Sequence, residues 1–256
     1  MKTVLRYMWA PFANLLWYLY TAVMGAIALT LSLFDTTGAI VHWCERTWSR
    51  LICRTIGARI RVSGRENIRA GRTYVFMANH SSLIDIPALI LAVPGQFRIM
   101  AKKELFRIPF WGWCLKRAGH FSIDRSNPKE TARSLRKVVA GVRAGKSLAL
   151  FPEGTRSADG KLLRFKPGAF KLAMRAGVEI VPVTICGASE LLPRGSLAPR
   201  PGRVDVIIGK PISASACDDN LSELMERTRR IIASNLEGRH LEGERAARLT
   251  AQSTGR

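Results

Sequence analysis

The chain is 256 residues long and carries 40 Lys and Arg against 19 Asp and Glu, which gives a formal net charge of +21. Because 47% of the residues are hydrophobic, a buried core can form, and a disordered polycation is excluded. The charge predicts an anionic partner, but it does not choose among nucleic acid, an anionic membrane and a phosphorylated substrate. The length fits one domain of the larger α/β kind with a short appendage.

The N-terminal region predicts attachment to a membrane. No formal charge occurs from Tyr7 to Phe34, a run of 28 residues, and about 20 apolar residues suffice for a helix that crosses a bilayer. Pro11 and Asn14 interrupt the first third of this run, where aromatic residues gather as they do at a headgroup boundary. A spanning helix and a reclining helix both remain open.

The next segment has the pattern of a basic amphipathic helix. Its apolar residues recur at helical spacing and include Trp43 and Trp48. Another face carries Arg46, Arg50 and Arg54. A helix of this kind typically lies in the plane of an anionic membrane interface; the alternative is a helix packed on the protein with a solvated arginine face. We expect residues 1–57 to form an N-terminal membrane-associated helical element that docks on the bilayer.

From about Ala58 the pattern changes to alternating strand-like and helix-like segments. Strand-like runs lie at 74–78, 98–101, 148–151, 179–185 and 204–208, and helical patterns at 84–92, 127–142, 167–176 and 221–232. This order predicts an α/β fold with a mostly parallel central sheet flanked by helices. We expect one α/β domain to cover residues 58–236, and residues 237–256, which lose helical periodicity, to form a disordered tail.

A polar turn with His80 and Asp85 follows the strand-like segment 74–78. Ligands bind at the C-terminal edge of parallel strands, so we expect His80 on that edge and Asp85 in the first turn of the next helix. The carboxylate would accept a hydrogen bond from Nδ1 of His80 and leave Nε2 free as a base. From Ser82 to Asp85 the sequence also fits a capping box, so the pattern leaves catalysis and capping open. Without a GxSxG nucleophile pattern, such a base would act on a substrate hydroxyl.

Two further turns place an arginine at the end of an apolar segment. Arg125 closes the stretch that begins at Gly119, and Arg156 lies in the turn 151–157, after the most apolar strand-like run. The planar fork of arginine suits bidentate binding of a phosphate. These two arginines are therefore candidates for a phosphate clamp, whereas a structural ion pair or a solvated side chain is the alternative for each.

With these motifs the sequence closely resembles the 1-acylglycerol-3-phosphate acyltransferase family, which has four ordered motifs. They match at Asn79, His80 and Asp85 (NHxxxxD), at Gly119 and Ile123–Arg125, at Phe151–Ser157 (FPEGTRS, complete) and at Ile180–Val183 with its central Pro182. Ser122 departs from the pattern, which has a larger apolar residue there. The resemblance covers residues 60–210, and the combination of NHxxxxD with a complete FPEGTRS makes it specific.

The resemblance implies transfer of an acyl chain from acyl-CoA or acyl carrier protein to the sn-2 hydroxyl of lysophosphatidic acid, which gives phosphatidic acid. It implies that His80 is the general base and that Asp85 orients its ring. The remaining roles that it implies are phosphate binding by Arg125 and Arg156, a glycerol site shaped by Glu153, Gly154 and Thr155, and an acyl-chain path bordered by Pro182.

The same resemblance implies a membrane-associated protein at the cytoplasmic face of the inner (plasma) membrane. Its partners would be the lipid bilayer, lysophosphatidic acid and the acyl thioester, with no nucleic acid. No cofactor and no metal are expected, because no histidines are paired at metal-ligand spacing and acyl transfer from a thioester needs no cation. We expect His120 to be a packed histidine rather than a catalytic one.

Two alternatives remain. The same base and arginines would serve a related membrane acyltransferase that acts on another lysophospholipid or an acyl-amino-acid lipid. The second alternative is a non-enzymatic basic module that binds membranes or nucleic acid. It leaves the complete FPEGTRS motif unexplained, and the sequence shows no recognition helix and no RNP-type aromatic pattern.

Overall fold

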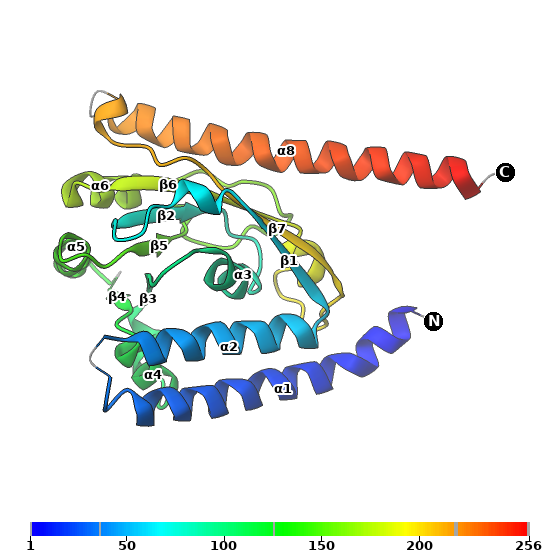
Figure 1. The fold of residues 1–256 in the computed structure, drawn as a ribbon, viewed down its shortest axis with the longest axis horizontal. Helices are drawn as coiled ribbons and strands as arrows, with labels where there is room; N and C mark the ends of the chain where they lie inside the picture. Colours follow the sequence, from blue (N-terminus) through cyan, green and yellow to red (C-terminus); the bar gives the residue numbers. More distant parts are fainter. Residues whose placement is uncertain (1, 36, 125, 218–219, 255–256) are drawn as a thin grey trace.

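A seven-stranded sheet forms the centre of the computed structural model, which describes residues 2–35, 37–124, 126–217 and 220–254 (Figure 1). The strands are β1 (Ala58–Ser63), β2 (Tyr74–Ala78), β3 (Arg98–Lys102), β4 (Phe121–Ile123), β5 (Leu148–Leu150), β6 (Glu179–Cys186) and β7 (Gly202–Ile208). Their order in the sheet is β1-β7-β6-β2-β5-β3-β4. Neighbouring strands pair in parallel except β6 and β7, so the predicted mostly parallel sheet is confirmed.

Two of these strands have no clear signal in the sequence. In β1 the residues alternate between half-buried and exposed positions, and its arginines Arg59 and Arg61 are exposed, as suits a strand at the edge of the sheet. Strand β4 has three residues and is the opposite edge. Short or charged strands give a weak apolar pattern, so only the pairing in the sheet identifies them.

Helices cover both faces of the sheet, as Figure 1 shows. The α-helices are α1 (Lys2–Leu31), α2 (Ala39–Thr55), α3 (Asp85–Ala92), α4 (Trp111–Arg117), α5 (Pro128–Arg143), α6 (Pro167–Ala176), α7 (Ala188–Leu191) and α8 (Leu221–Thr254). Short 3₁₀ turns are η1 (Arg65–Asn67), η2 (Lys103–Arg107) and η3 (Ser215–Cys217). Helix α5 begins as its sequence predicts, because the Asn127 side chain accepts a hydrogen bond from the Glu130 N–H and Pro128 is the first helical residue.

The two faces of β2 carry separate parts of the core. Phe76 packs with residues of α3 such as Leu89, whereas Val75 packs with Val138 of α5 and Phe170 of α6. Successive side chains of a strand point to opposite faces, and every residue of β2 is buried. A strand covered on both faces is apolar throughout, which is why β2 reads as an unbroken hydrophobic run.

The N-terminal helices pack on the domain. Helix α1 runs along α2 and reaches α4, and α2 packs on α3. The Trp48 indole N–H donates to Thr21 of α1 over 3.0 Å, and the Arg46 guanidinium donates to the Ile90 carbonyl near the end of α3 over 3.0 Å. Helix α2 is therefore packed on the protein, which is the alternative to a helix lying in the membrane interface. Of its three arginines, Arg46 caps the end of α3, whereas Arg50 and Arg54 are exposed to solvent.

The C-terminal segment corrects one expectation. Helix α8 continues to Thr254, so the prediction of a disordered tail over 237–256 is wrong up to that residue, and residues 255 and 256 lie outside the described part. The segment lacks an apolar face but is rich in Glu, Arg, Ala and Leu, which are strong helix formers. A helix that projects beyond its domain, as α8 does in Figure 1, needs no apolar stripe.

A hydrogen bond between the side chains of His120 and Glu45 joins α2 to the turn before β4. Nε2 of His120 lies 3.0 Å from Oε1 of Glu45, and Nδ1 of His120 accepts the Ile99 N–H over 3.2 Å. His120 is thus a packed histidine, as expected. Burial alone would raise the pKa of Glu45, but the hydrogen bond with His120 and the interaction with His42 outweigh burial and lower this pKa from 4.5 to about 2.

Replacing Glu45 with Gln is expected to lower the free energy of unfolding at neutral pH by about 1–3 kcal/mol, because His120 loses a charged partner. The wild-type carboxylate contributes stability above its unfolded pKa near 4.5 and loses it as the pH falls toward the folded value of about 2. The difference between wild type and variant should therefore shrink in denaturant titrations from pH 6 to pH 3. The exposed Glu66→Gln is the control, and a difference that does not change with pH would contradict the hydrogen bond between His120 and the ionised carboxylate.

Candidate active site

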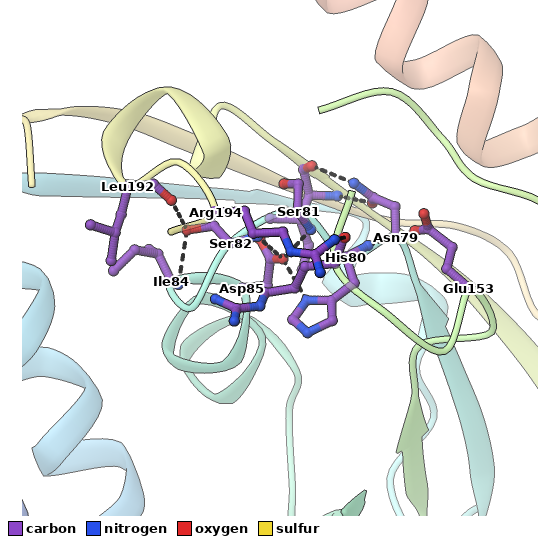
Figure 2. A network of polar contacts seen from close by, with 11 residues as sticks. Asn79, His80, Ser81, Ser82, Ile84, Asp85, Glu153, Leu192 and Arg194 are labelled. Atoms are coloured by element: carbon purple, nitrogen blue, oxygen red, sulfur yellow. Dashed lines mark hydrogen bonds and ion pairs between the residues drawn. The ribbon is translucent and has the colours of Figure 1, made fainter. Parts of the chain in front are cut away.

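The turn between β2 and α3 holds His80 and Asp85 side by side, as Figure 2 shows. Nδ1 of His80 lies 2.8 Å from Oδ2 of Asp85, and the histidine side chain is 16% exposed while the carboxylate is fully buried. A neutral imidazole that donates from Nδ1 to a carboxylate keeps Nε2 as an acceptor. The pair can therefore take a proton from a hydroxyl group that approaches from solvent or lipid.

Asp85 also fastens the turn on which His80 lies. The oxygen that faces the imidazole accepts the backbone N–H groups of Ser81, over 2.7 Å, and of Ser82, over 2.8 Å. Asp85 is the first residue of α3. The same carboxylate oxygen thus orients the histidine and fastens the turn before α3. The predicted capping box is not formed, because the N-cap residue of α3 is Ile84 and it has no side-chain cap.

The main chain of His80 is held by the loop 151–157, which follows β5. The His80 N–H donates to Oε1 of Glu153 over 2.7 Å, and the His80 carbonyl accepts the Ser157 N–H over 2.8 Å. The imidazole stacks on the ring of Phe151 at a centroid distance of 3.9 Å. Ring and main chain are both fixed by the FPEGTRS motif, so the two motifs form one unit.

The buried carboxylate of Glu153 accepts backbone hydrogen bonds from both motifs' surroundings, the His80 N–H and the Leu163 N–H. Its second oxygen, Oε2, accepts the Leu163 N–H over 2.9 Å, and the residue is 2% exposed. Burial raises the pKa of this carboxyl group above its ordinary value, against the lowering effect of the two backbone donors. Gly154 next to it has a φ of +74°, a left-handed conformation that favours glycine. Glu153 therefore holds the loop through hydrogen bonds to backbone N–H groups, and Gly154 allows the backbone to turn there.

Asn79 and Ser82 hold the same turn to the other side of the sheet. The Asn79 amide donates to the Ile185 carbonyl over 2.8 Å and accepts the Ile185 N–H over 2.7 Å. The Ser82 hydroxyl donates to the Leu192 carbonyl over 2.7 Å. The sequence does not predict either of these two contacts, although a polar residue directly after a buried strand is a signal for such a contact.

Of the predicted phosphate ligands, one is described. Arg156 is half-buried, Thr155 beside it is exposed, and the Arg156 carbonyl accepts a hydrogen bond from Nη1 of Arg194 over 2.8 Å. Arg125 lies outside the described residues. The preceding Asp124 follows β4 and pairs with Lys103, a hydrogen bond that lowers the pKa of Asp124 well below its ordinary range.

Pro182 is buried in the middle of β6, in register with Met77 of β2. Its carbonyl accepts the N–H of Gly209 over 2.8 Å, just beyond β7. Because Met77 precedes His80 by three residues, Pro182 lies inside the sheet and not at the edge where His80 is found. Its role at the border of an acyl-chain path stays a prediction.

An apolar cavity of about 200 Å³ lies between α1, α2, α3, β3 and α4. Its lining includes Met24, Ile86, Ile90, Ile99 and Leu115. Ile86 directly follows Asp85 in α3, so the cavity reaches the helix that begins at the turn with His80. In the described residues no group of three or more His, Cys, Asp or Glu side chains has the arrangement of a metal site.

Comparison with known proteins agrees with this geometry. Residues 59–186 match the family model described as Acyltransferase. A crystal structure of the 1-acyl-sn-glycerophosphate (LPA) acyltransferase PlsC from Thermotoga maritima superimposes with a TM-score of 0.83 at 26% identity, and the alignment covers 93% of this chain and 97% of that one.

Three curated relatives are named 1-acyl-sn-glycerol-3-phosphate acyltransferases. The protein of Saccharomyces cerevisiae is 35% identical over 211 residues, 80% of this chain and 69% of its own length. The protein of Chlamydomonas reinhardtii is 29% identical over 92% of this chain and 69% of its own length. For the chloroplastic protein of Arabidopsis thaliana these values are 35%, 69% and 50%. The chain thus spans about half to seven tenths of these relatives.

Replacing Glu153 with Gln is expected to lower the free energy of unfolding by about 1–3 kcal/mol, because the side-chain amide of Gln points one N–H group at a backbone donor. Amide hydrogen exchange should speed up at His80 and Leu163, the two donors to this carboxylate. The exposed Glu190→Gln is the matched control. Unchanged exchange at both amides would show that Glu153 does not hold the loop.

Proposed function

The chain belongs to the acyltransferase family, and on this premise we propose that it transfers an acyl chain from acyl-CoA or acyl carrier protein to the sn-2 hydroxyl of lysophosphatidic acid, giving phosphatidic acid. The observation that carries the proposal is the 2.8 Å contact between His80 Nδ1 and Asp85 Oδ2 beside the loop 151–157. The names of the relatives, which refer to this reaction, support it.

His80 acts as the general base. Its Nε2 takes the proton of the glycerol hydroxyl while the hydroxyl oxygen attacks the thioester carbonyl, and the C–S bond then breaks as the ester C–O bond forms. The imidazolium returns the proton to the departing thiolate. The buried carboxylate of Asp85 stabilises the imidazolium during this exchange.

The acceptor is held by its phosphate. Arg156 and Arg125 are the phosphate ligands, with Gly154 and Thr155 along the glycerol. Arg156 supports this role because no acidic side chain pairs with it in the described part of the chain, which leaves its fork for a ligand.

The cavity between α1 and α3, whose lining does not include Pro182, takes the acyl chain. An aliphatic tail needs a dry apolar channel that starts near the reacting carbonyl, and the apolar lining beginning at Ile86 has this character. The thioester carbonyl then lies at the N-terminal end of α3, near His80. No metal or other cofactor takes part in this reaction, because the thioester is already an activated acyl group.

The protein docks on a bilayer through one apolar surface. The exposed large hydrophobic side chains of the described part gather on α1, the residues after it, α2, η2 and α4, with Leu83 and Leu197 nearby. None of them lies on α5, α6 or the described side chains of α8. Tyr7–Leu31 is long and apolar enough to cross a membrane, but it packs along α2, which packs on α3 (Figure 1). Helix α1 therefore reclines in the interface.

We propose that the enzyme docks on the cytoplasmic face of the inner (plasma) membrane. The lysolipid and its product both reside in the leaflet below α1, while the water-soluble acyl thioester arrives from the opposite side. The buried, unpaired cysteines Cys44, Cys53, Cys186 and Cys217 suit a reducing compartment.

His80→Ala and Asp85→Asn are expected to lower kcat for lysophosphatidic acid, by about 10²–10⁴ for the first variant, because the reaction loses its base. Asparagine keeps the shape of Asp85 but removes the charge that stabilises the imidazolium. Glu66→Gln, at an exposed position of η1, is the control.

A panel of acceptors with labelled acyl-CoA measures the effect. It should include lysophosphatidic acid, other lysophospholipids and acyl-amino-acid lipids. Wild-type activity in the His80→Ala protein would refute the proposed base, and turnover of another lipid without turnover of lysophosphatidic acid would refute the proposed acceptor.

The double variant Phe12→Ser with Leu15→Ser is expected to weaken partition into vesicles by about tenfold or more, because both exposed side chains lose their apolar contact with lipid. Flotation with vesicles of stated anionic lipid content measures the bound fraction. Glu226→Ser with Arg230→Ser changes two exposed residues of α8 without changing the net charge, and it should bind as wild type does. Equal binding of both double variants would contradict docking through α1.

A further inference from the structure

We infer that Arg194, on the loop between α7 and β7, binds the phosphate of the acceptor together with Arg156, and that the contact of this loop with α1 positions it at the membrane surface. The inference rests on the proposed function and extends it to a residue outside the four sequence motifs.

The loop that carries Arg194 contacts the turn with His80 at its first residue, Leu192. The Leu192 carbonyl, two residues before Arg194, accepts the buried Ser82 hydroxyl over 2.7 Å. The base of the loop is closed by the Arg200 N–H, which donates to the Leu191 carbonyl over 2.8 Å. Arg194 is therefore held close to the turn that carries His80, and Figure 2 shows it among the side chains of this network.

The position of the guanidinium is set by the loop 151–157. Nη1 of Arg194 donates to the Arg156 carbonyl over 2.8 Å, and the side chain is exposed. One N–H group is engaged in this contact, and a guanidinium has five. The remaining donors lie at the same loop as Arg156, where they can complete a bidentate contact with phosphate.

The loop 151–157 and Arg194 together carry positive charge that favours binding of an anion. Within the described residues neither Arg156 nor Arg194 has an acidic partner, whereas Arg203 and Arg239 share Asp205. The bond from Arg194 Nη1 to the Arg156 carbonyl brings both residues to one loop, and like charges brought together without a counter-charge repel each other. A phosphate dianion relieves this repulsion, so the two arginines together favour a phosphorylated acceptor over one without phosphate.

The same loop contacts the membrane-docking helix. The Leu197 carbonyl accepts the Asn14 side-chain amide over 2.8 Å, and the Leu197 side chain is 71% exposed. Arg194 thus lies three residues from a contact with α1. The phosphate of a lysolipid lies at headgroup level while its chain is in the bilayer, so a guanidinium tied to an interfacial helix meets the phosphate at that level.

Arg194→Ala is expected to raise KM for lysophosphatidic acid about tenfold to a hundredfold, the effect of losing a hydrogen bond to a charged group. KM for acyl-CoA and the Tm should stay at the wild-type values. Arg194→Lys should restore part of the loss, because it keeps the charge but not the fork. Arg200→Ala is the control, since it removes an exposed arginine from the same loop.

Discrimination against an acceptor without phosphate separates this role from a structural one. The preference of the enzyme for lysophosphatidic acid over 1-monoacylglycerol should fall in Arg194→Ala by the factor that KM rises. An Arg194→Ala enzyme that behaves as Arg200→Ala does, or that loses activity equally on both acceptors, overturns the inference. If wild type itself fails to acylate lysophosphatidic acid, it is the proposed function that fails.

Asn14→Ala tests the contact with α1. Loss of this hydrogen bond should raise KM for lysophosphatidic acid in vesicles about twofold to tenfold, in the same direction as Arg194→Ala, with the vesicle-bound fraction unchanged. An unchanged KM in Asn14→Ala overturns the part of the inference that concerns α1.

Discussion

Two backbone hydrogen bonds hold His80 in place, and the rest of the site depends on them. The loop after β5 accepts the His80 N–H through Glu153 and donates to the His80 carbonyl through Ser157. With its main chain fixed and its ring stacked on Phe151, the imidazole needs only the carboxylate of Asp85 to set its tautomer. Preorganisation of this kind avoids reorganisation when the proton moves. It also explains why a buried acid in the loop 151–157 matters to a histidine in the turn after β2.

The parallel arrangement of β2, β5 and β6 makes this possible. Their C-terminal ends meet at one edge of the sheet, so the turns that follow them are neighbours although they lie far apart in the sequence. Asn79 bridges to β6 through Ile185, and Ser82 bridges to the segment after it. The turn with His80 is thereby held by β6, by the segment after β6 and by the loop after β5. Helix α3, which begins at this turn, contributes Ile86 and Ile90 to the apolar cavity.

In the proposed function the N-terminal helices connect the active site to the lipid. Helix α2 is fixed to the domain by Arg46 and Glu45, and α1 packs against α2 with its other side exposed. A cavity lined by residues from both helices, from α3 and from α4 lies directly behind this surface. The apolar surface and the polar edge are therefore parts of one rigid arrangement, in which an amphipathic substrate can keep its chain in an apolar environment and its headgroup in a basic one.

The sequence by itself determined the class of fold, most of the buried strands, the start of α5, and the family to which His80, Asp85 and FPEGTRS belong, because these follow from local periodicity, capping and motif spacing. It also placed the membrane-facing run at the N-terminus. It misjudged the segment after residue 236, where helix propensity outweighs the missing apolar stripe, and it left the dual role of Asp85 open. Only the tertiary structure decided that Glu153 binds the His80 N–H, that α2 packs on α3, and that Arg194 lies beside Arg156. Such contacts join residues far apart in the chain, and their partners are chosen by how the strands line up in the sheet, which no local pattern records.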